Sequence, residues 1–190
     1  MLLVVGLGNP GKEYEKTRHN VGFRVLDQIV SGIGCCSWKS LIGARVVKLA
    51  IGSSDVLFAK PMTYMNLSGD AVGSLLHYYK LDLKDLIVVH DELDFAPGVV
   101  RIKIGGGHGG HNGLRSIITH VGKEFVRVRL GIGKPSINMA GADYVLSSFD
   151  KREQSHIDDA IALAAKAVVS IIEDGTQVAM NYFNRHDNNA

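Results

Sequence analysis

Side chains suited to acyl-group chemistry follow two of the apolar stretches in this chain. Asn9 lies in a glycine-rich turn just after the apolar stretch 2–5, and His19 comes shortly after that turn. Asp91 follows the apolar stretch 86–89. In open α/β sheets, ligands bind beyond the carboxyl ends of the strands, where loops from several strands meet. We therefore expect these three side chains to meet at one edge of a sheet.

A histidine beside an aspartate can activate water. His19 would serve as a general base, and Asp91 would hold the tautomer of the ring and stabilise the imidazolium that forms. Each residue also has a plainer interpretation: His19 as a capping or solvated histidine, and Asp91 as a turn or helix-capping residue. No serine lies in a Gly-x-Ser-x-Gly turn and neither cysteine lies on a strand-end loop, so no covalent nucleophile is evident. Water activated by His19 is the simpler hypothesis.

Three asparagines on separate loops extend this hypothesis. Asn66 and Asn112 each stand in a loop just before an expected helix, and Asn9 lies in the first turn. Their amide N–H groups can donate hydrogen bonds to a developing oxyanion or hold a substrate in place. Asparagine is also common in turns and at helix N-caps, so each residue alone is weak evidence. Taken together, the three favour a role in substrate binding.

The segment 105–113 contains five glycines within six residues, at positions 105, 106, 107, 109 and 110. It follows the apolar stretch 99–104, so we expect it to join the same edge of the sheet. Glycine costs conformational entropy, so such a run suits a backbone that must bend sharply or approach a ligand. No Gly-Lys-Ser/Thr sequence follows the segment, which argues against a nucleotide P-loop.

Two cofactor sites are weaker interpretations. Gly6-x-Gly8-x-x-Gly11 matches the dinucleotide fingerprint as a string. However, residues 12–16 have no apolar periodicity and the helical pattern begins only at Val21, so the helix that the fingerprint needs is missing. A zinc site is the other alternative, although its spacing is loose and no HExxH sequence appears. Its ligands would be His90, Asp91, His108 and His111. We expect neither a cofactor nor a metal.

Basic residues gather on two of the expected strands. Lys103, Arg127 and Arg129 lie on these strands, with Arg101 and Lys134 nearby. They can be read simply as a solvated strand face. If the two strands pair, the outward side chains would form a compact cationic patch suited to phosphate.

Hydrophobic periodicity outlines the elements that must position these residues. Strands are expected at 2–7, 45–51, 56–59, 86–89, 99–104 and 125–132, the last with Arg127 and Arg129 outward. Helices are expected from Val21 to about Gly32 or Gly34, at 69–80 with Ser68 as its cap, at 114–121, around 157–168, and from Thr176 to about Phe183. The polar end 186–190 is expected to fray. This order predicts a single-domain α/β fold, residues 1–190, with a twisted, mixed, largely parallel sheet and helices on both faces.

Composition narrows the class of protein. The 190 residues are 46% hydrophobic and 21% charged, with a net charge of +2, which is ordinary for a globular domain and too mild to indicate nucleic acid by itself. The two cysteines, Cys35 and Cys36, are neighbours, so we expect no disulfide framework. Because no second cysteine cluster is present, we also expect them to form no zinc site of their own. No stretch approaches the ~20 apolar residues of a membrane span, and the apolar start is too short for a signal peptide. We expect a soluble protein of the reducing cytoplasm.

Six motifs together resemble the bacterial peptidyl-tRNA hydrolase family. They occur in the order and spacing of that family, from residue 2 to about 185, and are far more specific together than any one alone. The motifs are Gly6-Leu-Gly-Asn-Pro-Gly11, Thr17-Arg-His-Asn20, Pro61-Met-Thr-Tyr-Met-Asn-Leu-Ser-Gly69, His90-Asp-Glu-Leu-Asp94, Gly105–Leu114 and Arg127-x-Arg-x-Gly-Ile-Gly133.

The resemblance implies a monomeric enzyme with an α/β fold that hydrolyses an ester without a metal or a cofactor. Its substrate would be peptidyl-tRNA, whose ester between peptide and terminal ribose is cleaved to recycle tRNA from peptides dropped by the ribosome. The catalytic residues of the family fall on His19 and Asp91. Its substrate-binding positions fall on Asn9, Tyr14, Met65, Asn66, His111 and Asn112, and its clamp for the tRNA 5′-phosphate falls on Lys103 and Arg129. A metalloenzyme and a non-catalytic RNA-binding module are the alternatives.

Overall fold

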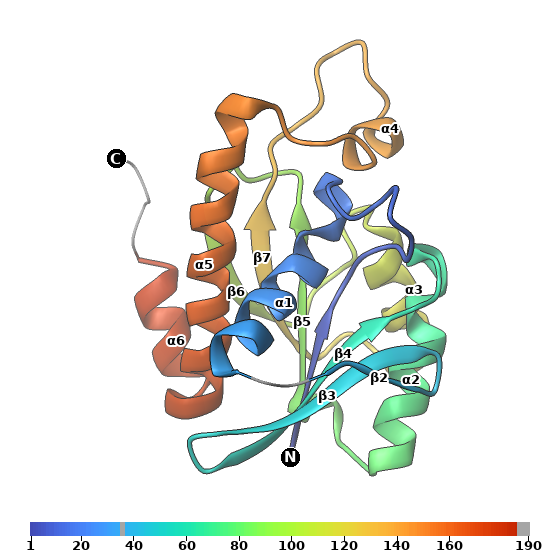
Figure 1. Ribbon diagram of the computed structural model, residues 1–190, viewed down its shortest axis with the longest axis vertical. Coiled ribbons are helices and arrows are strands. Elements are labelled where there is room, and N and C mark those ends of the chain that lie inside the picture. Colours follow the sequence, from blue (N-terminus) through green and yellow to red (C-terminus); the bar gives the residue numbers. More distant parts are fainter. Residues whose placement is uncertain (35–36, 186–190) are drawn as a thin grey trace.

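The computed structural model describes residues 1–34 and 37–185 and contains a seven-stranded mixed sheet in the order β2-β3-β4-β1-β5-β7-β6 (Figure 1). The strands are β1 (Leu2–Gly6), β2 (Lys39–Leu41), β3 (Ala44–Ile51), β4 (Ser54–Pro61), β5 (Leu86–Glu92), β6 (Val100–Ile104) and β7 (Val126–Gly131). The four central strands, β4, β1, β5 and β7, are mutually parallel, whereas β2, β3 and β6 join antiparallel. The predicted mixed, largely parallel sheet is confirmed.

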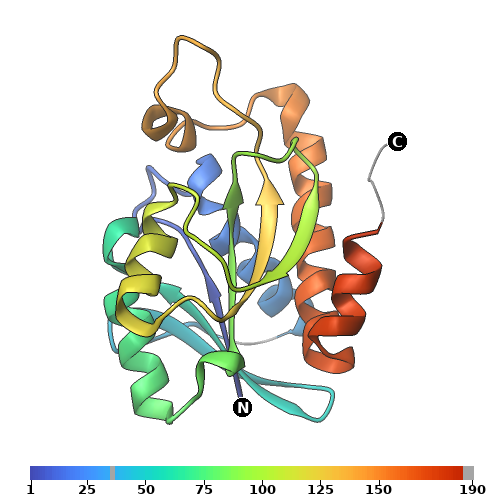
Figure 2. The same cartoon turned by 180° about the vertical axis from the view of Figure 1, so that it is seen from behind.

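Helices cover both faces of this sheet, as expected (Figures 1 and 2). One face carries α1 (Val21–Ile33), α5 (Lys151–Asp174) and α6 (Thr176–Phe183), and the other carries α2 (Ser68–Tyr79) and α3 (Asn112–Val121). Short helical segments are η1 (Arg18–Asn20), η2 (Met65–Leu67), η3 (Leu83–Asp85) and α4 (Gly141–Val145). No helix in the described residues has both the length and the apolar character needed to cross a membrane.

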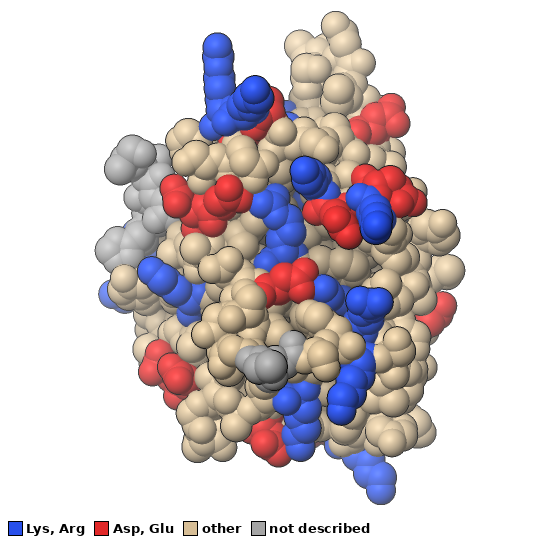
Figure 3. Space-filling view, viewed as in Figure 1, with Lys and Arg blue, Asp and Glu red and all other residues tan. Residues whose placement is uncertain are grey.

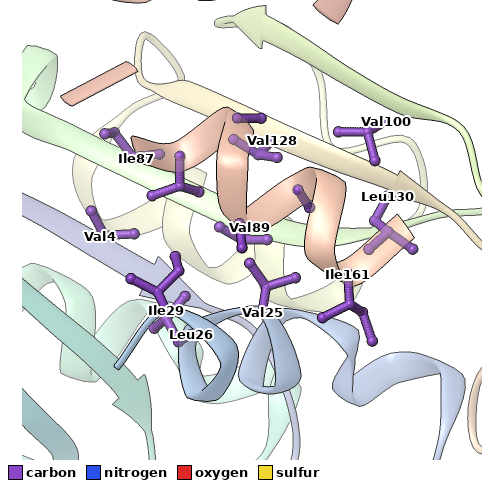
Figure 4. Packing of buried hydrophobic residues seen from close by; sticks show 14 of the residues in the cluster. Val4, Val25, Leu26, Ile29, Ile87, Val89, Val100, Val128, Leu130 and Ile161 are labelled. Carbon is purple, nitrogen blue, oxygen red and sulfur yellow. The ribbon is translucent and has the colours of Figure 1, made fainter. Parts of the chain in front are cut away.

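Side chains along the central strands point alternately to the two faces of the sheet, so the core has two layers. Val4 of β1 and Val89 of β5 face α1 and α5, where they pack with Val25 and Ile161 (Figure 4). Their neighbours Val5 and Val88 point to the opposite layer, under α2 and α3. A strand that is buried on both faces must be apolar at every position, which explains the continuous apolar runs of β1 and β5.

The direction of each strand determines which loops reach the candidate site. The carboxyl ends of β1, β4, β5 and β7 lie at one edge of the sheet because these strands are parallel. The expectation that the strand at 99–104 ends at this same edge was wrong. β6 is antiparallel to β7, with Ile104 opposite Val126, so it ends at the other edge. The glycine-rich segment then runs back along the sheet to start α3 near the end of β5 (Figure 2).

Element boundaries differ from the sequence expectations at a few functional points. β5 continues through Glu92, because His90, Asp91 and Glu92 all pair with β7, so Asp91 lies on a strand and not in the loop after it. Ser68 does not cap α2; it is the first residue of the helix, and its hydroxyl donates to the carbonyl of Met65 at 2.8 Å. The short elements β2 and α4 were not predicted. Expectations for Cys35, Cys36 and residues 186–190 concern residues outside those described.

Candidate active site

A pair of glycines brings the start of α1 against the sheet and thereby places His19. Gly6 ends β1, and Gly22 lies in the first turn of α1. A Cβ at Gly22 would collide with the backbone of Leu7 and Val89, and a Cβ at Gly6 would collide with the backbone of Gly22. Only glycine permits this close approach. His19, in η1 just before α1, is consequently held beside the carboxyl end of β5.

His19 and Asp91 form a buried hydrogen-bonded pair. Nδ1 of His19 lies 2.9 Å from Oδ1 of Asp91, and the two side chains are 9% and 2% exposed. Burial lowers the pKa of His19, but the charge and hydrogen bond of Asp91 outweigh this effect and raise the pKa above the ordinary imidazole value. Burial would raise the pKa of Asp91, yet interactions with His19 and His111 hold it well below the ordinary carboxyl value. Asp91 is therefore an ionised acceptor, and Nε2 of His19 is left to take a proton.

His111 makes a second hydrogen bond to the same carboxylate. Its Nε2 lies 2.9 Å from Oδ1 of Asp91. Its Nδ1 accepts the backbone N–H groups of Gly113 (3.1 Å) and Leu114 (3.3 Å), so His111 is the N-cap of α3. The ring of His90 packs edge-on against His111 at 5.1 Å, and burial together with His111 lowers the pKa of His90 to about 3. His90 is thus uncharged near neutral pH.

These side chains open onto a cavity of about 260 Å³ at the carboxyl end of β5. Four segments of the chain form its wall. One of them is α4, which contributes only small or apolar side chains. The lining residues are His19, His90, Asp91, Glu92, Leu93, His108, Gly109, Gly110, His111, Asn112, Gly141, Ala142 and Val145. The structure therefore brings together four of the predicted site residues, His19, Asp91, His111 and Asn112, around one hollow.

Asn9 is buried and is held by Asn20, the residue that follows His19. Its backbone N–H donates to Oδ1 of Asn20, and its carbonyl accepts from Nδ2 of Asn20, each at 2.9 Å. The side-chain oxygen of Asn9 accepts the backbone N–H of Met65 at 2.8 Å. This bond orients the amide so that its NH2 group is left to donate. Asn9 lines a neighbouring hollow of about 290 Å³.

The remaining predicted substrate-binding residues lie around this edge in different environments. Asn112 is the exposed first residue of α3, and Asn66 is exposed in η2. Met65 is 4% exposed and supports the loop that holds Asn9. Tyr14 is half-buried in the turn after Gly11. Neither Asn66 nor Tyr14 is among the residues that line the two hollows.

Arg127 donates hydrogen bonds to the glycine-rich segment and is not part of the exposed cationic patch that the sequence predicted. Its guanidinium donates to the carbonyls of Gly106 and Gly107 and lies over the ring of Phe125 at 4.7 Å. The residue is 3% exposed, so the prediction that it faces outward was wrong. The physical reason is that the returning segment covers this part of the sheet, and its bent backbone offers carbonyl groups that need a donor. Gly106 itself has φ +100°, in the region that favours glycine.

Lys103 and Arg129 lie on the same face of β6 and β7, but they are not directly opposite. Lys103 pairs with Arg127, and Arg101 pairs with Arg129. Arg129 donates to Oε2 of Glu92 at 2.9 Å and lies over the ring of Phe95 at 4.3 Å. Lys103 is exposed. Figure 3 shows the opposite face of the molecule, which carries α1 and α5, and there basic and acidic side chains are interspersed.

Sequence reasoning missed the role of Arg18, the residue before His19. Its guanidinium lies over the rings of Tyr144 (4.3 Å) and Phe149 (4.5 Å) and donates to Glu153 through two nitrogens, at 3.0 and 2.6 Å. The backbone N–H of Arg18 also donates to the carbonyl of Ser147 at 3.0 Å. Arg18 thereby ties η1 to the segment that follows α4. Its place in the Thr-Arg-His-Asn motif was the available signal.

The four ligands of the alternative zinc site do not all converge: Asp91 and His111 come together with His19, whereas His90 and His108 are not in this set. Within the described residues, ligand atoms of His19, Asp91 and His111 lie within 4.8 Å of one another. Binding a metal through Nε2 of His111 would require its proton to move to Nδ1, toward which two backbone N–H groups point. That arrangement would place three donors against one another. This set therefore fits a hydrogen-bonded network better than a resident metal.

Comparisons with known proteins give one consistent family. The family model described as peptidyl-tRNA hydrolase matches residues 3–190. A peptidyl-tRNA hydrolase of Anaeromyxobacter dehalogenans is 48% identical over 186 residues, covering 97% of each chain, and one of Sulfurovum is 42% identical over 184 residues, covering 96% of this chain and 95% of its own. A crystal structure of the Acinetobacter baumannii enzyme superposes with a TM-score of 0.91 at 40% identity, covering 98% of this chain and 95% of its own. A peptidyl-tRNA hydrolase crystallised with n-propanol gives 0.93, also at 40% identity, covering 99% and 96%.

Proposed function

This chain belongs to the peptidyl-tRNA hydrolase family, its activity is the hydrolysis of peptidyl-tRNA, and we propose that the buried His19–Asp91 pair performs it. The bond cleaved joins the peptide to the terminal ribose of tRNA, so the reaction returns tRNA to translation. The observation that supports this assignment most directly is the 2.9 Å contact between Nδ1 of His19 and Oδ1 of Asp91 at the wall of a cavity.

In the proposed reaction, Nε2 of His19 takes a proton from water while the water oxygen attacks the ester carbonyl. Asp91 stabilises the imidazolium that results. The bond to the ribose oxygen then breaks, and that oxygen receives the proton from His19. The products are a free ribose hydroxyl and a peptide carboxylic acid, which releases its remaining proton to solvent and becomes a carboxylate. An ester is far more reactive than an amide, so a base and hydrogen-bond donors suffice without a covalent nucleophile. General base catalysis typically contributes ~10²–10⁴-fold.

The asparagines supply the donors in this proposal. Asn112 lines the same cavity as His19, and the bond from Met65 occupies the side-chain oxygen of Asn9, which leaves its NH2 group to donate. These groups would donate to the oxyanion or to the peptide, and Asn66 would hold the substrate from the neighbouring loop. Tyr14, Met65 and His111 would form the walls around the peptide and the acceptor end.

The tRNA would be held partly by its 5′-phosphate, at Lys103 and Arg129. Both side chains lie on one face of β6 and β7, and Glu92 and Phe95 restrain the guanidinium of Arg129. A restrained guanidinium is well suited to a phosphate because less conformational freedom is lost on binding. We further propose that the protein acts as a monomer in the cytoplasm, without metal or cofactor. The hydrogen bonds that hold His111 support metal independence.

Release of peptide from N-acylated aminoacyl-tRNA, compared with unacylated aminoacyl-tRNA, tests the substrate class. His19→Ala should lose most turnover but still bind tRNA, and wild-type hydrolysis should persist in EDTA. Near-normal turnover in His19→Ala would reject the base assignment. Loss of activity in EDTA that zinc restores would favour the metalloenzyme instead, and tight tRNA binding without ester cleavage would favour an RNA-binding module.

A further inference from the structure

Two histidines share one oxygen of Asp91, and the general-base mechanism uses only one of them. His19 and His111 approach Oδ1 from different elements, each at 2.9 Å, and their ring centroids are 4.9 Å apart. Since Asp91 is ionised, it can only accept hydrogen bonds. Both histidines must therefore donate to it, and Nε2 of His111, which carries the proton, cannot act as an acceptor.

The start of α3 sets which nitrogen of His111 carries the proton. Nδ1 accepts the N–H groups of Gly113 and Leu114, so the ring proton lies on Nε2 and points at Asp91. Gly113 makes this packing possible, because a Cβ there would meet Sδ of Met65 and would lie 3.1 Å from Cε1 of His111. The side chain of His111 is 8% exposed. The cap at the start of α3 thus fixes the tautomer of His111, and this tautomer lets Nε2 donate to Asp91.

We propose that His111 is a positioning residue for catalysis, which acts through Asp91 by fixing the carboxylate and sharing the negative charge of Oδ1. The carboxylate then orients His19 without stabilising the imidazolium so strongly that the ring stays protonated and is unavailable as a base. This inference rests on the proposed role of His19 as the general base. It gives His111 a task distinct from contact with the substrate.

Among the groups around His19, Asp91 is the one through which His111 can change the pKa of the His19 ring. From β5, Asp91 faces His19, while Glu92 is paired with Arg129 and His90 is uncharged. From the glycine-rich segment, His108 uses its Nδ1 to accept the N–H of Gly110. The cavity wall from α4 consists of Gly141, Ala142 and Val145, and the neighbouring Arg18 is paired with Glu153. If His111 no longer donates, the full charge of Oδ1 acts on His19 and raises the pKa of that ring further.

Two substitutions separate capping from positioning. His111→Asn keeps an acceptor near the position of Nδ1, and asparagine is a good N-cap, but its side chain is too short to reach Asp91. His111→Gln has a longer side chain whose amide can donate near the position of Nε2, but it caps poorly. His120→Asn is the matched control, since His120 lies at the other end of α3, where its Nε2 pairs with Asp70 at 2.7 Å.

We expect His111→Asn to keep the thermal midpoint of the wild type and to lose about 10- to 100-fold in kcat, the range typical of residues that orient a functional ligand. KM for an N-acylated aminoacyl-tRNA should stay within about twofold, and the acidic limb of the kcat/KM profile should move to higher pH, because a proton held more tightly must be removed. His111→Gln should recover much of the lost kcat despite a lower thermal midpoint.

Three results would overturn the inference: unchanged kcat in His111→Asn, a loss confined to KM, or a loss in His111→Gln as large as that in His111→Asn. A loss in His120→Asn matching that of His111→Asn would also overturn it. His19→Ala, measured in parallel, distinguishes failure of the proposed general base from failure of the proposed role of His111. If His19→Ala remains active, the proposed general base itself has failed; if it is inactive while His111→Asn is normal, only the role of His111 has failed.

Discussion

The side chain of Asn20 holds the backbone of Asn9 by two hydrogen bonds, one in each direction, both 2.9 Å long. Both residues are buried, at 2% and 7% exposure. Because Asn20 directly follows His19 in the chain, these bonds tie the first loop to the segment that carries the proposed base. The distance between the proposed oxyanion donor, Asn9, and the proposed base, His19, therefore depends on the side chain of Asn20.

Asn20→Asp should break this connection while preserving the shape of the side chain. The carboxylate can still accept from the N–H of Asn9 but cannot donate to its carbonyl, which leaves a buried acceptor unpaired at a cost of about 1–3 kcal/mol. We expect a lower thermal midpoint and reduced kcat/KM for peptidyl-tRNA. Asn181→Asp, at an exposed position that only accepts from Gln177, is the control and should change neither. Wild-type behaviour of Asn20→Asp would contradict this role.

The pH dependence of kcat/KM should report the pKa of His19, which burial lowers and Asp91 raises. The raised pKa of His19 places the acidic limb of kcat/KM above the ordinary imidazole range. In Asp91→Asn the raising charge is gone and burial dominates, so the limb should move to lower pH. Turnover should also fall, by less than in His19→Ala, because the amide no longer favours the proton on Nδ1. Steady-state rates from pH 5 to 9 would measure both effects, and a limb that stays in place would argue against the pairing.

Gly22→Ala tests the close approach that places His19. The added methyl group would collide with the backbone of Leu7 and Val89, and we expect a loss of about 1–3 kcal/mol in the free energy of unfolding, together with reduced turnover. Gly32→Ala is the matched control on the same helix, since nothing lies within 4 Å of its Cβ position. That control should raise stability by about 0.5–1 kcal/mol, because alanine favours the helix. Denaturant unfolding compares the two, and equal effects would reject the argument.

Glu153→Gln tests the anchorage of η1 through Arg18. A hydrogen bond from Arg18 lowers the pKa of Glu153, so its stabilisation is present above the ordinary carboxyl range and lost as the pH falls through the lowered value. Glu153 is partly exposed, so we expect a loss of about 1–2 kcal/mol at neutral pH and less at acidic pH. Asp158→Asn, which breaks the more exposed contact between Arg24 and α5, should cost less than ~0.5 kcal/mol. Unfolding measured at two pH values would show whether the two ion pairs differ.

Lys103 and Arg129 can be examined through the salt dependence of tRNA binding. If both contact phosphate, replacing both by alanine should reduce the slope of log K against log salt by about 1–2, because fewer counterions are released. Lys48→Ala is a suitable control, since Lys48 lies on the hairpin of β3 and β4 and pairs with Asp55 at 3.0 Å. An unchanged slope in the double variant would place the phosphate contact elsewhere.

The sequence was sufficient for most elements because their signals are local. The spacing of Val21, Val25 and Ile29 is enough to predict α1, and the continuous apolar runs are enough to predict β1 and β5. The motifs carried the family resemblance and, with it, the candidate residues His19 and Asp91. These features depend on neighbours within a few positions, which the sequence shows directly.

What only the tertiary structure decided concerns pairing between distant segments. Whether β6 runs parallel or antiparallel depends on its partner, and this choice sends the glycine-rich segment back along the sheet, buries Arg127 and delivers His111 to Asp91. Periodicity marks which positions are buried but not which side chain they meet. Hydrogen bonds depend on tenths of an ångström between residues far apart in sequence, so the shared oxygen of Asp91 emerges only when the chain is folded.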